Sequence, residues 1–275
     1  MSKLKLMAAL AAATAALGMA AAPAAAEQVN INTTGFSPTI GTAGNSVAFS
    51  GTSNGITVNA LASAWTATPT DTGGYTFAPS YMSRGALGLG VTSPDDSITN
   101  DGSRFHLIDN KDGFDFVLFQ FDQNVTITSA ILNQSSLLNG NIDNESSVGI
   151  GLSKLPWNTR LDLSNASLFD SLSIDFFDVA RFFTSDPTVR PDVPFNLGGQ
   201  SGNIWMIGAN LHNDDTVTFG NGTSPSYDAF NIQRLTVNTA GAVPEPASWA
   251  MMLTGFGLIG WGMRHKGVAR RPAIG

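Results

Sequence analysis

Cysteine is absent from the 275 residues of this chain, and lysine and glutamate are scarce. The first absence excludes disulfide bonds, thiolate metal sites and cysteine nucleophiles, so the folded part must be stabilised by its core alone. Between residues 27 and 243 the only glutamates are Glu27 and Glu145. Because lysine and glutamate are common helix formers, their scarcity beside abundant Thr, Ser, Asn, Gly and Phe indicates strands.

Histidine, the commonest acid–base residue, is also rare, since only His106 and His212 lie between the two ends of the chain. No pair of histidines at helical spacing indicates zinc, and a nucleophilic or zinc hydrolase is disfavoured. The remaining catalytic chemistry is that of paired carboxylates, which hydrolyse sugars when they lie within several ångströms of each other. The candidates are Asp95, Asp96, Asp109, Asp112, Asp115, Asp175 and Asp178.

Positive charge is scarce in the central part of the chain. Six of the 14 basic residues lie in the first five or the last twelve residues, whereas all 21 acidic residues lie between Glu27 and Glu245. Eight basic residues therefore stand against 21 acidic ones, a net charge of −13. Long-range attraction to nucleic acid or anionic lipid is not expected, whereas solubility outside the cell and oxygen-ligated cations such as calcium are favoured.

The first 26 residues have the layout of a secretory signal peptide. Lys3 and Lys5 precede an apolar, alanine-rich stretch over residues 6–22, and Ala24-Ala25-Ala26 supplies the small residues that signal peptidase needs. The mature chain is therefore expected to begin at Glu27. The alternative, a retained helical anchor, is disfavoured by the small residues that follow the apolar stretch directly.

Residues 244–275 form a second segment with its own layout. Pro244-Glu245-Pro246 precedes an uncharged stretch, 247–263, and a basic end. As a helix this stretch is roughly 25 Å long, just short of a ~30 Å hydrocarbon layer, which predicts a single transmembrane helix rather than the alternative, a buried core helix. Three features support a transmembrane helix. Indole side chains lie near both ends of the stretch, its glycines allow close helix packing, and the basic residues that follow it are typical of a cytoplasmic end. The residues of the predicted anchor are Trp249, Gly255, Gly257, Gly260, Trp261, Arg264, Lys266, Arg270 and Arg271.

The order of tripeptide, apolar span and basic end resembles the PEP-CTERM sorting signal of exported proteins of Gram-negative bacteria. In that family the membrane enzyme exosortase recognises the tail, and the Pro-Glu-Pro region marks the processing site. The resemblance implies a chain that is exported, anchored in the inner membrane in transit and then located at the cell surface or outside the cell. It covers only the tail, which residues 238–243 connect as a short flexible spacer to the rest of the chain.

Residues 27–237 are expected to form one all-β domain, or alternatively two small ones. Short alternating runs recur between Gly, Asn, Asp and Pro, which predicts a β-sandwich, most simply a jelly roll. The runs 88–91, 108–110, 114–121 and 228–237 also resemble jelly-roll domains often found ahead of this kind of tail. The expected strands are 29–33, 47–49, 56–59, 75–77, 86–91, 114–121, 125–132, 148–152, 204–211, 216–219 and 230–237.

Two local predictions concern the connections. Asp122-Gln123-Asn124 separates two strongly apolar runs, so residues 114–132 are expected to form a hairpin whose first strand is covered on both faces. Over residues 168–183 the apolar positions have helical spacing, and Asn165 could cap a helix there. A strand reading of 168–183 is nearly as good.

Acidic loops admit a calcium site. Asp95, Asp96, Asn100, Asp101 and Asp109 offer carboxylate and amide oxygens between expected strands, and calcium accepts six to eight such oxygens. The alternative is that Asp and Asn form turns here, as they do in the loops of most β-proteins.

Two classes of function remain. The first is a non-catalytic surface or matrix protein, processed by signal peptidase and exosortase, associated with exopolysaccharide or biofilm and carrying a lectin-like face for extracellular polysaccharide. The second is a secreted carbohydrate-active enzyme, a glycosidase or lyase, on a jelly-roll scaffold. The candidates for stacking on sugar rings are Tyr75, Tyr81, Trp157 and Trp205, although large aromatics more often lie in the core.

Overall fold

The computed structural model describes residues 26–35, 43–71, 73–94, 107–111, 113–134, 145–179, 192–195, 197–211, 216–219, 222–225, 228–239, 254–257 and 259. Contacts separate the unit Glu27–Ala240 from the two end segments, and every described strand lies in this unit. The unit is all-β, as the composition predicts. Its strands are β1 (Gln28–Asn32), β2 (Ser46–Ser53), β3 (Ile56–Pro69), β4 (Tyr75–Pro79), β5 (Tyr81–Gly85), β6 (Gly88–Thr92), β7 (Ile108–Asp109), β8 (Phe114–Gln134), β9 (Ser146–Gly151), β10 (Asp175–Val179), β11 (Asp192–Pro194), β12 (Gly202–Ala209), β13 (Thr216–Phe219), β14 (Gly222–Pro225) and β15 (Ala229–Thr239), and its described helix is α2 (Ala166–Ser171).

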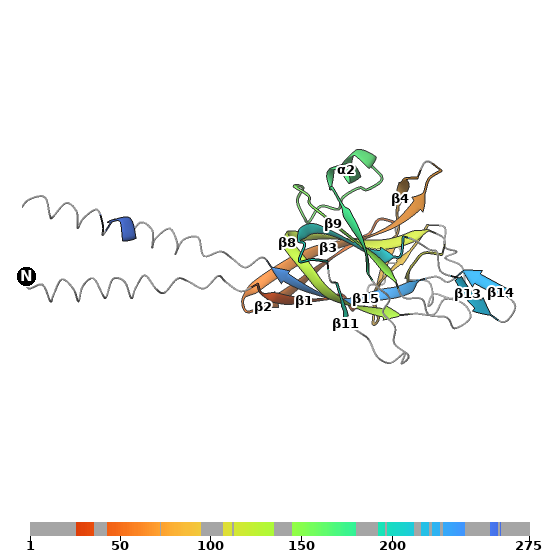
Figure 1. Cartoon of the computed structure of the whole chain (residues 1–275), viewed down its shortest axis with the longest axis horizontal. Helices are drawn as coiled ribbons and strands as arrows, with labels where there is room; N and C mark the ends of the chain where they lie inside the picture. Colours follow the sequence, from red (N-terminus) through yellow and green to blue (C-terminus); the bar gives the residue numbers. More distant parts are fainter. Residues whose placement is uncertain are drawn as a thin grey trace, which may run out of the picture. The chain divides into compact units, whose positions relative to one another are not determined.

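The strands form two groups that share β8 (Figure 1). In the first group, the N-terminal half of β8 lies between β3 and β12, and β9 and β10 follow outward from β12. In the second group, the C-terminal half of β8 pairs with β15 and β11, and β15 also pairs with β1, β6 and β7. β13 and β14 form a separate two-stranded sheet. All of the pairings are antiparallel, and two groups joined in this way are consistent with the predicted β-sandwich.

The predicted hairpin at residues 122–124 is wrong, because β8 runs as one strand of 21 residues through this position. The Asp122 carboxylate accepts hydrogen bonds from the amide and the side chain of Asn59, and the Gln123 side chain donates to the carbonyl of Thr57. These contacts keep the three residues extended beside β3. A three-residue hairpin loop usually has a residue with positive φ, and none occurs at 122–124. The expected turn is instead the place where β8 passes from one strand group to the other.

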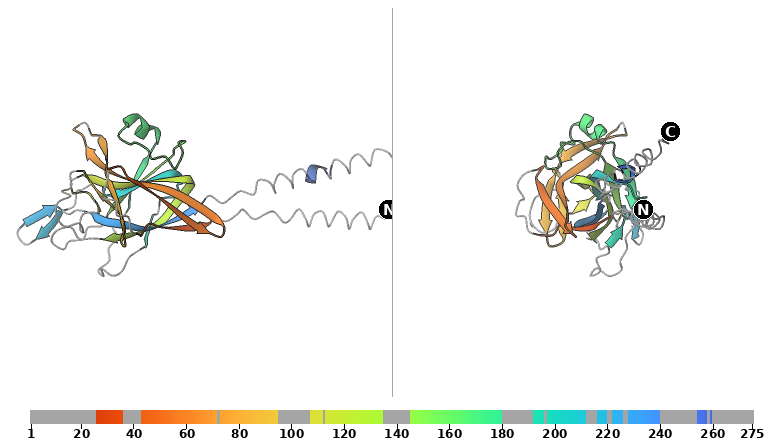
Figure 2. Two further views of the ribbon diagram at one scale, coloured as in Figure 1. Left: turned by 180° about the vertical axis from the view of Figure 1, so that it is seen from behind. Right: turned by 90° about the vertical axis from the view of Figure 1, so that its left-hand side faces the viewer.

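The turn between β2 and β3 contains the positive-φ residues that are missing at positions 122–124 of β8. Asn54 and Gly55 have φ of 45° and 80°, which is the combination that a tight hairpin turn requires. Gly51 precedes this turn in the sequence and lies inside β2, opposite Val58. The resulting long hairpin of β2 and β3 is drawn in orange in Figure 2.

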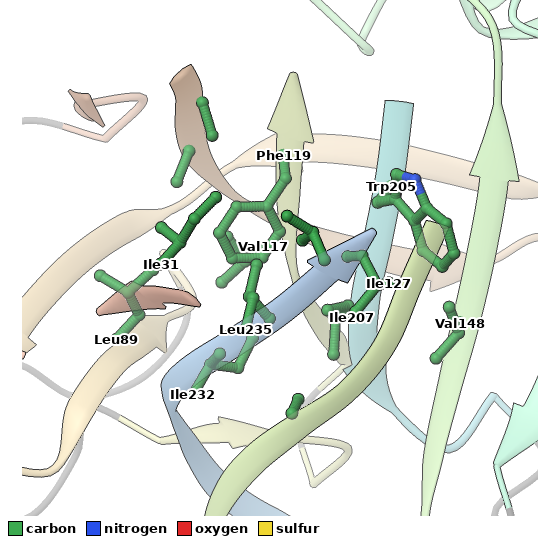
Figure 3. Packing of buried hydrophobic residues seen from close by; sticks show 14 of the residues in the cluster. Ile31, Leu89, Val117, Phe119, Ile127, Val148, Trp205, Ile207, Ile232 and Leu235 are labelled. Atoms are coloured by element: carbon green, nitrogen blue, oxygen red, sulfur yellow. The ribbon is translucent and has the colours of Figure 1, made fainter. Parts of the chain in front are cut away.

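The main core lies between the two strand groups. Alternate side chains of β1, β6, β8, β9, β12 and β15 point into the same space, as Figure 3 shows for Ile31, Leu89, Phe119, Trp205 and Leu235. Trp205 is fully buried, and its indole N–H donates to the carbonyls of Gly202 and Val125 at 3.1 and 3.3 Å. Because the whole side chain is buried and its N–H is hydrogen-bonded, Trp205 is a core residue and not a sugar platform.

The segment over residues 168–183 contains both predicted structures. A helix of six residues, α2, begins after Asn165, whose side chain accepts from the amide of Leu168 as predicted. Ser173 then takes a φ of 47°, and the chain continues as β10, which pairs with β9. The helix therefore ends much earlier than its apolar spacing predicts, because the edge of β9 provides backbone hydrogen bonds for residues 175–179. Residues 180–183 lie outside the described part of the chain.

Candidate functional site

A cleft of about 420 Å³ lies on the outer face of the first strand group. Its floor is part of a second apolar cluster, which is formed on the face of β3, β8 and β12 that points away from the main core. The members of this cluster are Trp65, Ala67, Phe116, Leu118, Leu161, Leu163, Leu172, Ile204 and Met206. The first strand of the predicted hairpin is therefore covered on both faces, as expected.

The segment 152–174 covers this outer face, and Gln120 holds it there. Gln120 is only 2% exposed; its amide group donates to the carbonyls of Trp157 and Thr159 at 3.1 and 2.8 Å and accepts from the amide of Leu161 at 3.0 Å. Since all three partners are backbone groups, Gln120 fixes the path of the segment as well as its distance from the sheet. The cleft opens where this cover ends, beside α2 and β4.

Aromatic rings form the walls of the cleft. Phe77 of β4 lies edge-on to Phe116, with ring centroids 5.9 Å apart, and against Phe169 of α2, with centroids 4.3 Å apart. Tyr75 lies edge-on to Phe114 at 5.9 Å. Edge-on pairs are one of the favoured arrangements of aromatic rings, so the two edge-on contacts stabilise the walls.

Two of the wall rings are exposed to solvent. Tyr75 is 41% exposed and Phe176 of β10 is 43% exposed, which is unusual for side chains of this size. Exposed aromatic side chains in the lining of a concave site are typical of a place where a ligand or partner binds. The exposed rings therefore distinguish this cleft from the buried clusters of the same domain.

The described lining of the cleft contains few polar groups and no positively charged side chain. Thr76, Ser147, Ser164 and Asp170 line it, and no Lys, Arg or His belongs to its described lining. Asp115 also borders the cleft, but its carboxylate is turned to the opposite face, where it accepts from the hydroxyl of Thr66 at 2.5 Å. The cleft thus offers stacking surfaces, hydroxyl groups and one exposed carboxylate, that of Asp170.

The rim beside α2 is held by local hydrogen bonds. The Asp162 carboxylate accepts from the hydroxyl and the amide of Ser164 at 2.6 and 3.2 Å, and chiefly the hydroxyl bond holds the pKa of Asp162 below its usual value. Arg160 stacks over the ring of Trp65, with its guanidinium carbon 4.4 Å from the ring centroid. Burial lowers the pKa of Arg160, which nevertheless stays protonated at neutral pH.

A buried polar cluster fixes the far end of the cleft. Asp228 is 3% exposed, and its carboxylate accepts from the side chain of Asn110 at 2.9 Å, the amide of Asn210 at 3.2 Å and the amide of Glu145 at 2.6 Å. Asn210 in turn contacts the hydroxyl of Ser147, which lines the cleft. Asp228 therefore connects the starts of β9 and β15 with the ends of β7 and β12.

The predicted calcium ligands are only partly described. Asp109 lies in β7, where its carboxylate accepts from the amide of Lys111, while Asp95, Asp96, Asn100 and Asp101 lie outside the described residues. Within the described ranges no group of three or more His, Asp or Glu side chains could hold a metal ion. The calcium site therefore stays a prediction. His106, His212 and Asp112 are also outside the described part of the chain.

One serine has a sequence context that could suggest a nucleophile. Ser53 stands in Gly51-Thr52-Ser53-Asn54-Gly55, which has the Gly-x-Ser-x-Gly form. A nucleophile elbow would place this serine between a strand and a helix, whereas Ser53 ends β2 in a hairpin and its hydroxyl donates to Glu27 at 2.6 Å. These five residues therefore form the end of a strand and a hairpin turn, and the motif does not indicate a nucleophile.

The sorting tail is described at only a few positions. Residues 254–257 and 259 are helical and include Gly255 and Gly257. Within the described part of the chain, no helix has both the length and the apolar character needed to cross a membrane. Pro244, Glu245 and Pro246 and the other predicted anchor residues (Trp249, Gly260, Trp261, Arg264, Lys266, Arg270 and Arg271) lie outside the described ranges.

Sequence reasoning found one of the cleft's aromatic residues and missed the others. Tyr75 is one of the candidates that the sequence offers for stacking, whereas Phe77, Phe114, Phe169 and Phe176 are not among them. The alternation of Phe114 and Phe116 with Phe119 and Phe121 in one strand does carry a signal, because it places two pairs of phenylalanines on opposite faces. Tyr81 and Trp157 are half-buried and do not line the cleft.

Comparison with known families and proteins identifies the tail and nothing else. The family model described as the PEP-CTERM protein-sorting motif matches residues 242–266. Neither the curated proteins nor the solved structures contain a match to the chain. The match begins three residues after the last residue of β15, so the motif and the domain are almost contiguous.

Proposed function

We propose that this chain, which carries a PEP-CTERM sorting motif, is a non-catalytic protein of the cell surface or extracellular matrix of a Gram-negative bacterium. The motif implies export, membrane anchoring in transit and processing by exosortase. Signal peptidase removes residues 1–26, and the C-terminal helix holds the chain in the inner membrane until exosortase acts. The domain in front of the motif is proposed to be a jelly-roll-like sandwich, supported by its two strand groups around one core.

The cleft supports glycan binding as the function of this domain. The observation that carries the proposal is the pair of half-exposed rings, Tyr75 and Phe176, above an apolar floor. A pyranose ring has an apolar face that stacks on aromatic rings and an equator of hydroxyl groups, which the side chains of Thr76, Ser164 and Asp170 can bind. The excess of 21 acidic over eight basic residues makes acidic polysaccharide a poor ligand.

Each site should bind weakly. A cleft with two exposed rings and few polar groups is expected to hold one glycan unit with a Kd of about 1 mM. Retention in a matrix then depends on many copies of the protein on one surface, because linked sites raise the effective concentration without new contacts.

The first test measures retention and chain length on a panel of neutral and uronic-acid polysaccharides. Removing one ring with Phe176→Ala should weaken retention of the bound neutral polymer by about fivefold, since a stacking contact contributes about 1 kcal/mol. Leu87→Ala is the matched control, because Leu87 is 46% exposed and does not line the cleft. Equal retention of all three proteins would contradict binding in the cleft.

The alternative function is a secreted glycosidase or lyase, favoured by the carboxylates that the sequence places in loops. It predicts reproducible shortening of a polysaccharide, abolished by Asp→Asn changes at Asp95, Asp96 or Asp109. Such a result would replace the binding proposal.

The second test concerns the tail. In a cell with exosortase, the full-length chain should be retained and then shortened near Pro244-Glu245-Pro246, whereas a chain without residues 244–275 should appear in the medium unprocessed. Immunoblots of membrane and medium fractions measure both. Identical distribution of the two proteins would show that the tail has no sorting role.

A further inference from the structure

The two ends of the β-domain leave it side by side. β1 and β15 are antiparallel neighbours with Gln28 opposite Asn238, and the amide of Thr239 donates to the carbonyl of Glu27 at 3.0 Å. The chain therefore enters the domain at residue 27 and leaves it at residue 239 on one end of the strand layers. The residue that follows the expected signal-peptidase site and the strand that precedes the sorting motif in the sequence are therefore neighbours.

Other strands complete this end. The Glu27 carboxylate accepts from the hydroxyl of Ser53 and the side chain of Asn54 at 2.6 and 2.8 Å, which fixes the β2–β3 turn beside the N-terminus. Val125 of β8 pairs with Thr239, so the preceding residues of β8 lie at this end too. We call the end face the surface formed by Glu27, Asn54, Asp122 and Asn124, which lies beside the buried Thr239.

The distance from the end face to the motif is short. Pro244 follows Thr239 by five residues, so a fully extended chain separates them by at most about 18 Å. Ala247, where the uncharged stretch begins, follows by eight residues, at most about 29 Å. A protease that works at the membrane must therefore hold Pro244–Pro246 between the bilayer and a folded domain.

The domain cannot easily lengthen its connection to the motif by releasing the end of β15. β15 remains paired up to Thr239, and its hydrogen bonds to β1 and β8 would have to break before the chain could lengthen. The hydroxyl of Thr236 also donates to the side chain of Asn30 at 3.0 Å, across the same strand pair. The enzyme therefore meets the end face in its folded form.

We infer that the end face is the surface of this chain that exosortase contacts while it cleaves the tail, an inference that rests on the proposed processing. The exposed side chains of this surface, Asn54, Asp122 and Asn124, are polar or acidic. They fit a partner surface rich in hydrogen-bond donors or positive charge. An anionic bilayer would not attract them, and for this reason the enzyme is the partner that the charges favour.

The experiment follows cleavage of the full-length chain in cells with exosortase by pulse-chase. Deletion of residues 240–241 shortens the spacer by about 7 Å and should slow cleavage at least tenfold, because the enzyme then meets the domain before the motif reaches it. Asn124→Arg should slow cleavage about threefold, since it adds bulk and reverses the charge preference of the surface. A ten-residue Gly/Ser insertion after Gly241 should bring the Asn124→Arg chain back to the unmodified rate.

Leu87→Arg is the control at the other end of the domain. Leu87 lies in the β5–β6 turn, next to Asn133 and the start of β15, and is 46% exposed. It should leave the rate unchanged, and circular dichroism of each purified variant should show the same fold.

Normal cleavage of both the deletion and the Asn124→Arg chains would overturn the inference while leaving exosortase processing in place. Normal cleavage together with increased binding of Asn124→Arg to anionic vesicles would mean that the end face meets the bilayer instead. An unmodified chain that is never cleaved would contradict the proposed processing itself, and the inference with it.

Discussion

Replacing Gly88 by alanine is expected to destabilise the exported protein by about 3 kcal/mol or more. Gly88 begins β6 with a φ of 114°, a conformation that L side chains rarely adopt. A Cβ at this position would lie 2.0 Å from the carbonyl oxygen of Ile232, which belongs to the backbone of β15 and cannot turn aside. Relief of the clash would require β6 to move away from β15, and this would open the main core around Leu89.

Urea unfolding followed by circular dichroism measures the change. Gly85→Ala is the matched control in the same hairpin, because nothing lies within 4 Å of a Cβ added there. It should change the free energy of unfolding by less than about 0.5 kcal/mol. Similar midpoints for Gly88→Ala and the unmodified protein would mean that β6 and β15 are not packed as closely as described.

The second large effect is expected for Asp228→Ala, at about 3 kcal/mol. The substitution removes the acceptor of three hydrogen bonds and leaves the amides of Glu145 and Asn210 and the side chain of Asn110 without it in a buried place. Because Asn210 also contacts the Ser147 hydroxyl, the far end of the cleft should loosen, and glycan retention should fall together with stability.

The same unfolding experiment tests this prediction, with Asp71→Ala as the control. Asp71 is an exposed turn residue, so its removal should be almost neutral. Asp228→Asn keeps the shape of the side chain and one acceptor oxygen, and it should therefore cost less than Asp228→Ala. Equal stability of the two Asp228 variants and the unmodified protein would show that the buried cluster does not hold the strand ends together.

The sequence was sufficient where a property depends on composition or on a contiguous segment. The sorting motif is read from residues that follow one another, and a comparison of families confirms it at 242–266. The all-β character follows from alternation, and most expected strands are present, with boundaries shifted by a few residues. The Asn165 cap is likewise a local interaction, which its three-residue distance from Leu168 determines.

Tertiary contacts decided the features that depend on distant residues. Asp122-Gln123-Asn124 has the composition of a turn, yet Asn59 and Thr57 of β3 keep it extended. Asn59 and Asp122 are 63 positions apart in the sequence, so no local pattern could indicate their interaction. Residues 175–179 have helical spacing, yet the open edge of β9 makes them a strand. The cleft also depends on residues that are distant in the sequence, because its walls come from β4, β8, α2 and β10. Local residue patterns indicate which conformations a segment can take, whereas the hydrogen bonds and buried surface offered by neighbouring strands select one of them.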